Sequence, residues 1–305
     1  MGVESIKKWI KLSDRTEIEV GFSGDRHGKV VMLPVAKKPI YGSEAEALKQ
    51  WGIDPEAGKS LTEGLADSFG IIAFDYEDHL FRHPKPEDLT PERIAEDFLR
   101  IADGMNVDCF SYYGYSWLAL AGLQLAIRTD RLEALIMGGF PPYEGPYKEM
   151  LIVTEHTYKQ ALSNANTGSS TSKIETIENA GEEIDWNSIT VTINPSVAKQ
   201  FVTLYRNLAD FDDRSVQNKL LQLPKLAFAG EQDTIVYGDN FGGVTVDIIG
   251  LLVKNKANLI ERGWNVEILC EDAMNMDHTK AMQPAKVVPL IKRWLIEKLL
   301  SERKL

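Results

Sequence analysis

One short stretch of the chain places a serine where it could act as a nucleophile. Residues 111–122 read SYYGYSWLALAG, with Gly114 two residues before Ser116, at the point where strand-forming residues give way to helix-forming ones. A nucleophilic serine can be presented on a sharp strand-to-helix turn, which requires small neighbouring residues. Serine also favours the N-cap position of a helix, so this spacing alone leaves a purely structural role for Ser116 open.

A nucleophilic serine needs partners, because its hydroxyl reacts poorly at neutral pH without a neighbouring base. Imidazole titrates in the right range, and a carboxylate can fix its tautomer and stabilise its charged form. His278 is the only histidine beyond residue 156, and Asp233 ends the run AFAGEQD, which begins as an apolar segment. Taken singly, Asp233 is also typical of a turn and His278 of a helix start.

The elements that must position these side chains alternate between strand and helix. In the run TPER, Thr90 is a helix cap and Pro91 takes the first helical position. The alternation predicts an α/β fold, with a mostly parallel central sheet flanked by helices on both faces. The predicted strands are residues 16–22, 29–36, 71–75, 107–112, 132–137, 225–229 and 266–270; the predicted helices start at 91 or span 117–128, 197–209, 244–262 and 284–300.

The alternation breaks between residues 143 and 222. This segment contains several aromatic residues, the polar tract SNANTGSSTSK, which is expected to be a loop, and a mostly helical stretch. Because it follows the strand at 132–137, it leaves the sheet at the C-terminal edge, where Ser116 also emerges. The sequence predicts one core, residues 1–142 and 223–305, and a mainly helical cap, residues 143–222, over Ser116. An insertion on another surface is the alternative.

The arrangement around the serine resembles the α/β-hydrolase family. Gly114 occupies the small position two residues before the nucleophile of that family's elbow, whereas Leu118 stands where a second small residue is usual. The family's nucleophile, acid and histidine follow one another in this order along the chain. The resemblance therefore implies Ser116 as nucleophile, Asp233 as acid and His278 as base.

Two other aspartates compete with Asp233 for the role of the acid. Asp239 lies further into the same loop, and no strand directly precedes it. Asp277 adjoins His278, but neighbouring residues rarely present their side chains to one another in the required geometry. Asp233 is therefore the prediction.

The resemblance also implies an oxyanion hole, in which backbone N–H groups meet the negative charge on the substrate oxygen. The family commonly has His-Gly after the strand that reads VVMLPVA here, where this chain has Pro34-Val35. Pro34 has no N–H group, so Val35 or Ala36 would donate together with the amide of Trp117, and Val35 is the assignment. Tyr115, next to the nucleophile, is the predicted substrate contact.

Two further patterns suggest other chemistry. Gly58-Lys59-Ser60 resembles the end of a phosphate-binding loop, but Ile53 stands where the first glycine is required, and no apolar strand precedes it. His79 and His83 have the spacing of zinc ligands on a helix, but the segment is more typical of a loop, without further identifiable ligands. The sequence predicts neither a metal nor a cofactor, and leaves a substrate contact by the two histidines open.

Composition restricts the partners. The net charge is −11 and the pI about 5.1, with no stretch rich in lysine and arginine, which disfavours nucleic acid and anionic membranes. The N-terminus, MGVESIKKWIKLSD, lacks the apolar core of a signal peptide, and the apolar runs are shorter than the ~20 residues that cross a bilayer. Cys109 and Cys270 lie in apolar runs, which predicts buried thiols. We expect a cytoplasmic protein, and the sequence does not specify its oligomeric state.

Two functions follow from these observations. The first is a serine hydrolase that cleaves an ester or a related small-molecule acyl substrate through an acyl-enzyme. The second is a ligand-binding or signalling protein on the same fold without turnover, which Leu118 and the missing His-Gly favour somewhat. A fluorophosphonate probe discriminates between them, since labelling requires an activated serine.

Overall fold

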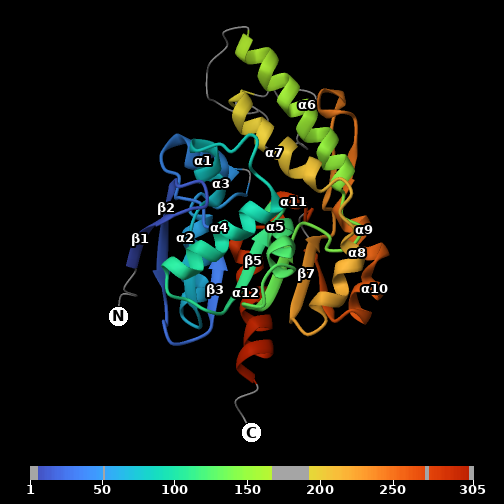
Figure 1. Ribbon diagram of the computed structural model, residues 1–305. Coiled ribbons are helices and arrows are strands. Elements are labelled where there is room, and N and C mark those ends of the chain that lie inside the picture. Colours follow the sequence, from blue (N-terminus) through green and yellow to red (C-terminus); the bar gives the residue numbers. More distant parts are fainter. Residues whose placement is uncertain (1–5, 51, 167–191, 272–274, 302–305) are drawn as a thin grey trace.

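An eight-stranded sheet organises the chain in the computed structural model, which describes residues 6–50, 52–166, 192–271 and 275–301 (Figure 1). The strands lie in the order β1-β2-β4-β3-β5-β6-β7-β10. β2 pairs antiparallel with β1 and β4, and all later neighbours are parallel. The strands are β1 (Ile6–Lys11), β2 (Glu17–Ser23), β3 (Val30–Leu33), β4 (Gly70–Ala73), β5 (Phe110–Tyr115), β6 (Leu132–Gly138), β7 (Lys225–Gly230) and β10 (Trp264–Leu269). The predicted α/β class with a mostly parallel sheet is confirmed.

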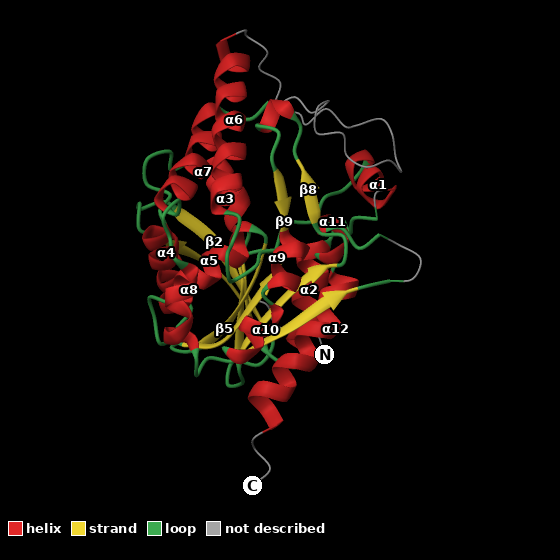
Figure 2. Cartoon of the chain, turned by 90° about the vertical axis from the view of Figure 1, so that its right-hand side faces the viewer, coloured by secondary structure: helices red, strands yellow, loops and turns green. Residues whose placement is uncertain are grey.

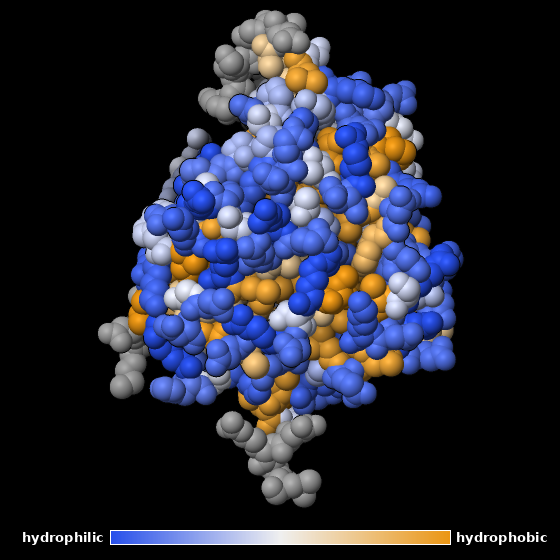
Figure 3. Space-filling view, in the orientation of Figure 1, coloured by the Kyte–Doolittle hydropathy of each residue, from blue (hydrophilic) through white to orange (hydrophobic). Residues whose placement is uncertain are grey.

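Helices cover both faces of this sheet (Figure 1, Figure 2). α4 (Pro91–Gly104), α5 (Trp117–Ala126), α9 (Ile248–Lys254) and α10 (Lys256–Glu261) contribute to one apolar cluster, and α2 (Ala57–Ala66) and α12 (Pro284–Leu295) to the other. The surface over α4 is mostly hydrophilic in Figure 3, because this amphipathic helix turns its apolar residues inward. Within the described residues, no helix is long and apolar enough to cross a membrane.

Strand alternation divides the side chains of β5 between the two clusters. Tyr112 joins the cluster with α4 and α5, whereas Tyr113 and Tyr115 join the cluster with α2 and α12. Every residue of β5 is buried. The strand is therefore a rigid support for the residue that follows it, Ser116.

Several predicted elements differ from those observed. Residues 244–262 are not one helix, because the Asp247 side chain accepts a hydrogen bond from the Gly250 N–H and starts α9 there, and α9 and α10 are separated at Asn255. The residues before Asp247 form β9 (Thr245–Asp247), which pairs with β8 (Thr234–Val236). A loop was predicted around His79, but Asp75 caps a helix, α3 (Tyr76–Arg82).

Both cysteines are exposed, so the prediction of buried thiols is wrong. Cys109 precedes β5, which begins at Phe110 and not at residue 107 as predicted. Cys270 follows β10, which ends at Leu269. Each thiol thus lies just outside the strand that was expected to bury it.

Two helices of the segment at residues 143–222 pack together beyond the carboxyl ends of the parallel strands, α6 (Tyr147–Asn166) and α7 (Pro195–Asn207) (Figure 1, Figure 2). The Gln200 side chain of α7 joins two backbone groups of the core, accepting from the Lys85 N–H at 3.0 Å and donating to the Leu80 carbonyl at 3.3 Å. The predicted loop tract at 163–173 begins inside α6, and its part from residue 167 lies outside the described residues.

Beneath α7, a cluster of charged side chains is buried next to α3 and α4. The Lys85 ammonium lies 2.7 Å from Asp97 Oδ2 and 3.2 Å from Asp14 Oδ2. The Tyr76 hydroxyl donates to the same oxygen of Asp97 at 2.7 Å. Buried charges require such pairing, since an unpaired one would have to be neutralised.

His79 borders this cluster, and its side chain is 2% exposed. Its Nε2 lies 3.0 Å from Thr16 Oγ1. That hydroxyl donates its own proton to Asp14 Oδ1, so Nε2 must carry a proton and donate to Thr16. Burial lowers the pKa of His79 to about 4. Nearby titratable groups are Lys85 and His83, which lower this pKa further, and Asp14 and Asp97, which raise it.

The neutral, buried His79 should make stability fall in acid. Because its pKa is depressed in the folded state, the unfolded chain binds more protons between pH 6.5 and about 4, so stability is lost as pH falls through this window. Over this pH window, we expect the free energy of unfolding of the wild type to fall by on the order of 3 kcal/mol more than that of His79→Gln. Urea denaturation of both proteins at pH 7, 5.5 and 4.5 measures it, and parallel pH dependences would contradict the expectation.

Candidate active site

Ser116 occupies a strained turn between β5 and α5. Its backbone has φ 56° and ψ −132°, a conformation that costs a residue with a side chain about 1–3 kcal/mol. The Ser116 N–H donates to the Gly138 carbonyl at 2.8 Å, which anchors the turn to the end of β6. Ser116 is the N-cap residue of α5, but its side chain makes no capping hydrogen bond in the described chain. Capping therefore does not account for the serine hydroxyl.

The neighbours of Ser116 fit this turn. A Cβ atom on Gly114 would lie 2.2 Å from the Leu118 carbonyl oxygen, so only glycine allows β5 to approach α5 this closely. Leu118, which replaces the small residue of the family's elbow, is 5% exposed and packs within the apolar cluster of α4 and α5. The Tyr112 hydroxyl donates to the Leu118 carbonyl at 2.7 Å. The second half of the elbow thus tolerates a large residue.

The structure brings Asp233 and His278 together. His278 Nδ1 lies 2.8 Å from Asp233 Oδ1, with Asp233 fully buried and the His278 side chain 20% exposed. The other oxygen, Asp233 Oδ2, is buried without a hydrogen-bond partner among the residues described. Asp277 instead accepts the Lys280 N–H and begins α11 (His278–Ala281), and Asp239 begins a short 3₁₀ turn after β8.

The loops that carry the aspartate and the histidine are joined backbone to backbone. The Gln232 N–H donates to the Met276 carbonyl at 3.1 Å. A Cβ atom on Gly230 would lie 1.9 Å from that carbonyl oxygen, so glycine is required where the two loops cross. The Asp233 carbonyl in turn accepts the Ile249 N–H at the start of α9. Both loops follow adjacent parallel strands, β7 and β10, at the carboxyl edge of the sheet.

Ser116 lies at the same edge, because β5 is parallel to β6 and β6 to β7. The serine is half-buried. In the described part of the chain its hydroxyl has no hydrogen bond, including none to His278. Hydrogen bonds between a nucleophile and its base are often long without substrate and tighten when it binds.

The backbone at Val35 leaves one N–H group available. Val35 and Asp75 face each other in an isolated antiparallel bridge, and they make no hydrogen bond with each other. The two hydrogen bonds of the bridge come from the neighbouring residues, from the Ala36 N–H to the Phe74 carbonyl and from the Tyr76 N–H to the Pro34 carbonyl. Ala36 is therefore excluded as a free donor. The Val35 and Trp117 N–H groups have no hydrogen-bond partner among the described residues, which is what oxyanion donors require.

The Trp117 side chain links the elbow to two other segments. Its Nε1 donates to Glu77 Oε1 at 3.0 Å, and Glu77 Oε2 lies 2.9 Å from the Lys37 ammonium, whose pKa this carboxylate raises. The Trp117 ring meets the Phe201 ring of α7 edge-on, with 5.3 Å between centroids. Glu77 and Phe201 were not identified from the sequence, because nothing local marks residues that meet only in the folded chain.

Tyr115 contacts His278 through both its hydroxyl and its ring. Its side chain is 4% exposed, and its hydroxyl donates to the His278 backbone carbonyl at 2.7 Å. The predicted contact of Tyr115 with substrate stays a prediction; the contact that the structure displays is with His278. His79 and His83, the other side chains considered for substrate contact, lie in or next to α3, and the described residues contain no cluster of three metal-binding side chains.

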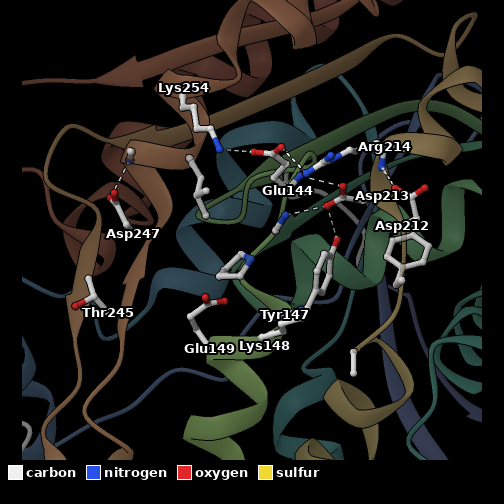
Figure 4. A pocket seen from close by; sticks show the side chains of 16 residues that line it. Glu144, Tyr147, Lys148, Glu149, Asp212, Asp213, Arg214, Thr245, Asp247 and Lys254 are labelled. Carbon is white, nitrogen blue, oxygen red and sulfur yellow. Dashed lines mark hydrogen bonds and ion pairs between the residues drawn. The ribbon is translucent and has the colours of Figure 1, made fainter.

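A separate cavity of about 570 Å³ opens where α6 begins, beside α8 (Asp213–Val216) and α9 (Figure 4). No residue predicted for the active site lines it. Three of its charged side chains are paired with one another, since Glu144 binds Arg214 at 2.6 Å and Lys254 at 2.7 Å. Asp213 accepts hydrogen bonds from the Glu144 N–H, the Gly145 N–H and the Tyr147 hydroxyl. These contacts fasten the two ends of the inserted segment to each other.

Comparison with known proteins gives a fold. No family model matches the sequence, and no curated protein matches it. Among solved structures, an α/β hydrolase from Novosphingobium aromaticivorans has a TM-score of 0.59 at 16% identity, over 98% of this chain and 100% of that one. A structure described with carboxylesterases of Nitrososphaera gargenis has a TM-score of 0.59 at 14% identity, over 95% and 98%.

A thermophilic esterase from Thermogutta terrifontis has a TM-score of 0.54 at 16% identity, over 96% of this chain and 99% of that one. These similarities extend over nearly the whole length of each chain. They agree with the mostly parallel eight-stranded sheet flanked by helices. The chain therefore has the α/β-hydrolase fold that the sequence resemblance implied.

Proposed function

We propose that the protein is a serine hydrolase that cleaves an ester or a related small-molecule acyl substrate through an acyl-enzyme. The observation that carries the proposal is the strained Ser116, whose hydroxyl is not used for capping, at the same sheet edge as the 2.8 Å contact between His278 and Asp233. A strained backbone at one polar residue indicates a functional constraint. The esterases among the solved structures of this fold add support.

In the proposed reaction, Ser116 Oγ attacks the substrate carbonyl carbon and its proton passes to His278 Nε2. Asp233 accepts a hydrogen bond from the Nδ1–H of the same ring, which leaves Nε2 as the free base and stabilises the imidazolium. The imidazolium then protonates the leaving alcohol as the carbon–oxygen bond breaks. His278 then deprotonates a water that attacks the acyl-enzyme carbonyl, and it returns this proton to Ser116 Oγ as the acyl–oxygen bond breaks and the acid is released.

The Val35 and Trp117 N–H groups are the proposed donors to the oxyanion. Neither is engaged by the described residues, and Trp117 follows the nucleophile directly. Preorganised donors of this kind typically contribute 10²–10³-fold to the rate. The chain would thus form the hole with Val35 in place of the family's His-Gly.

The segment at residues 143–222 is the proposed cap, above the core formed by residues 1–142 and 223–305. Phe201 of α7 packs on the Trp117 ring, one residue from the nucleophile, so α7 can shape the acyl site and exclude water. The chemistry of the residues requires no cofactor. Neither nucleic acid nor a membrane is a proposed partner, and a cytoplasmic location stays a prediction.

A fluorophosphonate probe and a series of p-nitrophenyl esters of increasing acyl length test the function. We expect covalent labelling of Ser116, identified by peptide mass spectrometry, and a preference for a limited range of acyl lengths set by the cap. The second candidate, ligand binding without turnover, rests on the missing hydrogen bond between the Ser116 hydroxyl and His278 in the described chain. Ligand binding without labelling or turnover would favour that candidate.

A further inference from the structure

We propose that the Tyr115 hydroxyl is the group that positions the His278 imidazole relative to Ser116. The inference rests on the proposed function and extends it, because it assigns Tyr115 a role that is separate from the predicted contact with substrate. Tyr115 directly precedes the nucleophile, so any bond from its side chain to the histidine joins the two reacting residues through a short path.

The contact has two parts. The Tyr115 hydroxyl donates to the His278 backbone carbonyl at 2.7 Å, and the two rings lie 5.0 Å apart between centroids, tilted by 52°. The hydrogen bond fixes the main chain of the histidine, and the ring contact supports its imidazole from the side of the sheet. The opposite constraint comes from Asp233, which holds Nδ1 at 2.8 Å.

The phenol is the donor in its bond to the His278 carbonyl. Burial, with the nearby negative charges of Asp233 and Asp277 contributing, holds the pKa of Tyr115 well above its usual range. The hydroxyl therefore keeps its proton across the pH range in which an esterase would be assayed. A carbonyl oxygen is the matching acceptor, so the bond persists whatever the charge on the imidazole.

The backbone around Tyr115 makes this link stiff. Tyr115 is opposite Gly138 in the register of β5 and β6, and the Ser116 N–H binds the Gly138 carbonyl. Gly139 has φ +63°, and a Cβ atom there would lie 2.7 Å from the Tyr115 ring and 2.8 Å from His278 Cε1. Two successive glycines thus allow the tyrosine and histidine rings to approach the backbone of β6 closely.

Tyr113 provides a matched control. It lies two residues earlier on the same strand and the same face of the sheet, is 1% exposed, and stacks on Phe228, as Tyr115 also packs on Phe228. No hydrogen bond of its hydroxyl to the described residues is present. Tyr113→Phe therefore removes a hydroxyl of the same kind from the same core without touching His278.

The experiment compares Tyr115→Phe with Tyr113→Phe in the full chain. We expect Tyr115→Phe to lower kcat and the rate of fluorophosphonate labelling about ten-fold, with KM changed less than about two-fold. The ¹H NMR signal of the His278 Nδ1 proton should broaden or shift in Tyr115→Phe and stay as in the wild type in Tyr113→Phe. A purely structural role would lower thermal stability without moving this signal.

Incorporation of 4-aminophenylalanine at position 115 restores a donor toward the same carbonyl, and we expect it to recover most of the lost rate. This variant also replaces Tyr115→Phe if the latter fails to fold. Wild-type rates and an unmoved Nδ1 signal in Tyr115→Phe would overturn the inference. If the wild type itself is neither labelled nor active, the proposed function is wrong, and the NMR signal alone then decides whether Tyr115 positions His278.

Discussion

Replacing Ser116 by alanine is expected to lower esterase activity by a factor on the order of 10⁴ or more and to abolish fluorophosphonate labelling. The substitution removes one oxygen atom, which makes no hydrogen bond in the described chain. The folded state therefore loses little, and the melting temperature should stay close to that of the wild type. Activity measured by ester hydrolysis, with circular dichroism to verify folding, tests this.

Ser116→Gly separates the strain of the turn from the chemistry. Glycine adopts the positive φ of 56° without a steric penalty, so this variant should exceed Ser116→Ala in stability by up to about 1 kcal/mol while being equally inactive. Such a result would mean that the chain sacrifices stability to present the hydroxyl. Full activity in Ser116→Ala would end the proposed mechanism.

The residues of the candidate site could be located from sequence because their signals are local. The glycine two positions before Ser116 meets a steric requirement, because a Cβ atom on Gly114 would lie 2.2 Å from the Leu118 carbonyl oxygen. The run AFAG before Asp233 likewise combines a buried strand with a glycine that meets the histidine loop. Strand, turn and order along the chain together select residues that lie at the same edge of the sheet, where Asp233 and His278 are in contact.

The contact of Tyr115 with His278 could not be predicted in the same way. Strand alternation sends its ring into the cluster with α2 and α12, but the expected end of the strand, at residue 112, placed it in the turn. β5 continues to Tyr115 because β6 pairs with it up to Gly138. The predicted and observed ends of the strand differ by three residues, and this difference decides whether the tyrosine is expected to face a ligand or the core. Only the pairing with the neighbouring strand determines where the strand ends.

Tertiary context also explains the other differences. β1 was not predicted because half of IKKWIK is lysine, as suits an edge strand, and the strand is held by pairing with β2. The predicted helix at 244–262 failed because Asp247 caps a helix that starts within it. Whether Val35 or Ala36 has a free N–H depends on hydrogen bonds to residues 74–76, about 40 positions away in the chain.

Asp233→Asn should reduce kcat by a factor on the order of 10⁴. The side chain is fully buried, and its Oδ1 accepts a hydrogen bond from the His278 Nδ1–H. If the asparagine amide turns its NH₂ toward His278, Nδ1 becomes an acceptor, the proton moves to Nε2, and the histidine can no longer take the proton of Ser116. If it turns its oxygen toward His278, the NH₂ occupies the position of Oδ2, which has no partner among the described residues, and a buried donor is left unsatisfied.

Asp277→Asn and Asp239→Asn are the controls for this prediction. Asparagine caps helices as well as aspartate does, so Asp277→Asn should keep α11 in place, and we expect both controls to retain activity within about three-fold of the wild type. Steady-state kinetics on one p-nitrophenyl ester, with probe labelling to measure the acylation step, distinguishes the three variants. A loss of 10²-fold or more in one of the controls, with Asp233→Asn near wild type, would assign the role of the acid to the aspartate replaced in that control. The reason is that only the carboxylate that orients the imidazole can produce a loss of activity of that size without unfolding the chain.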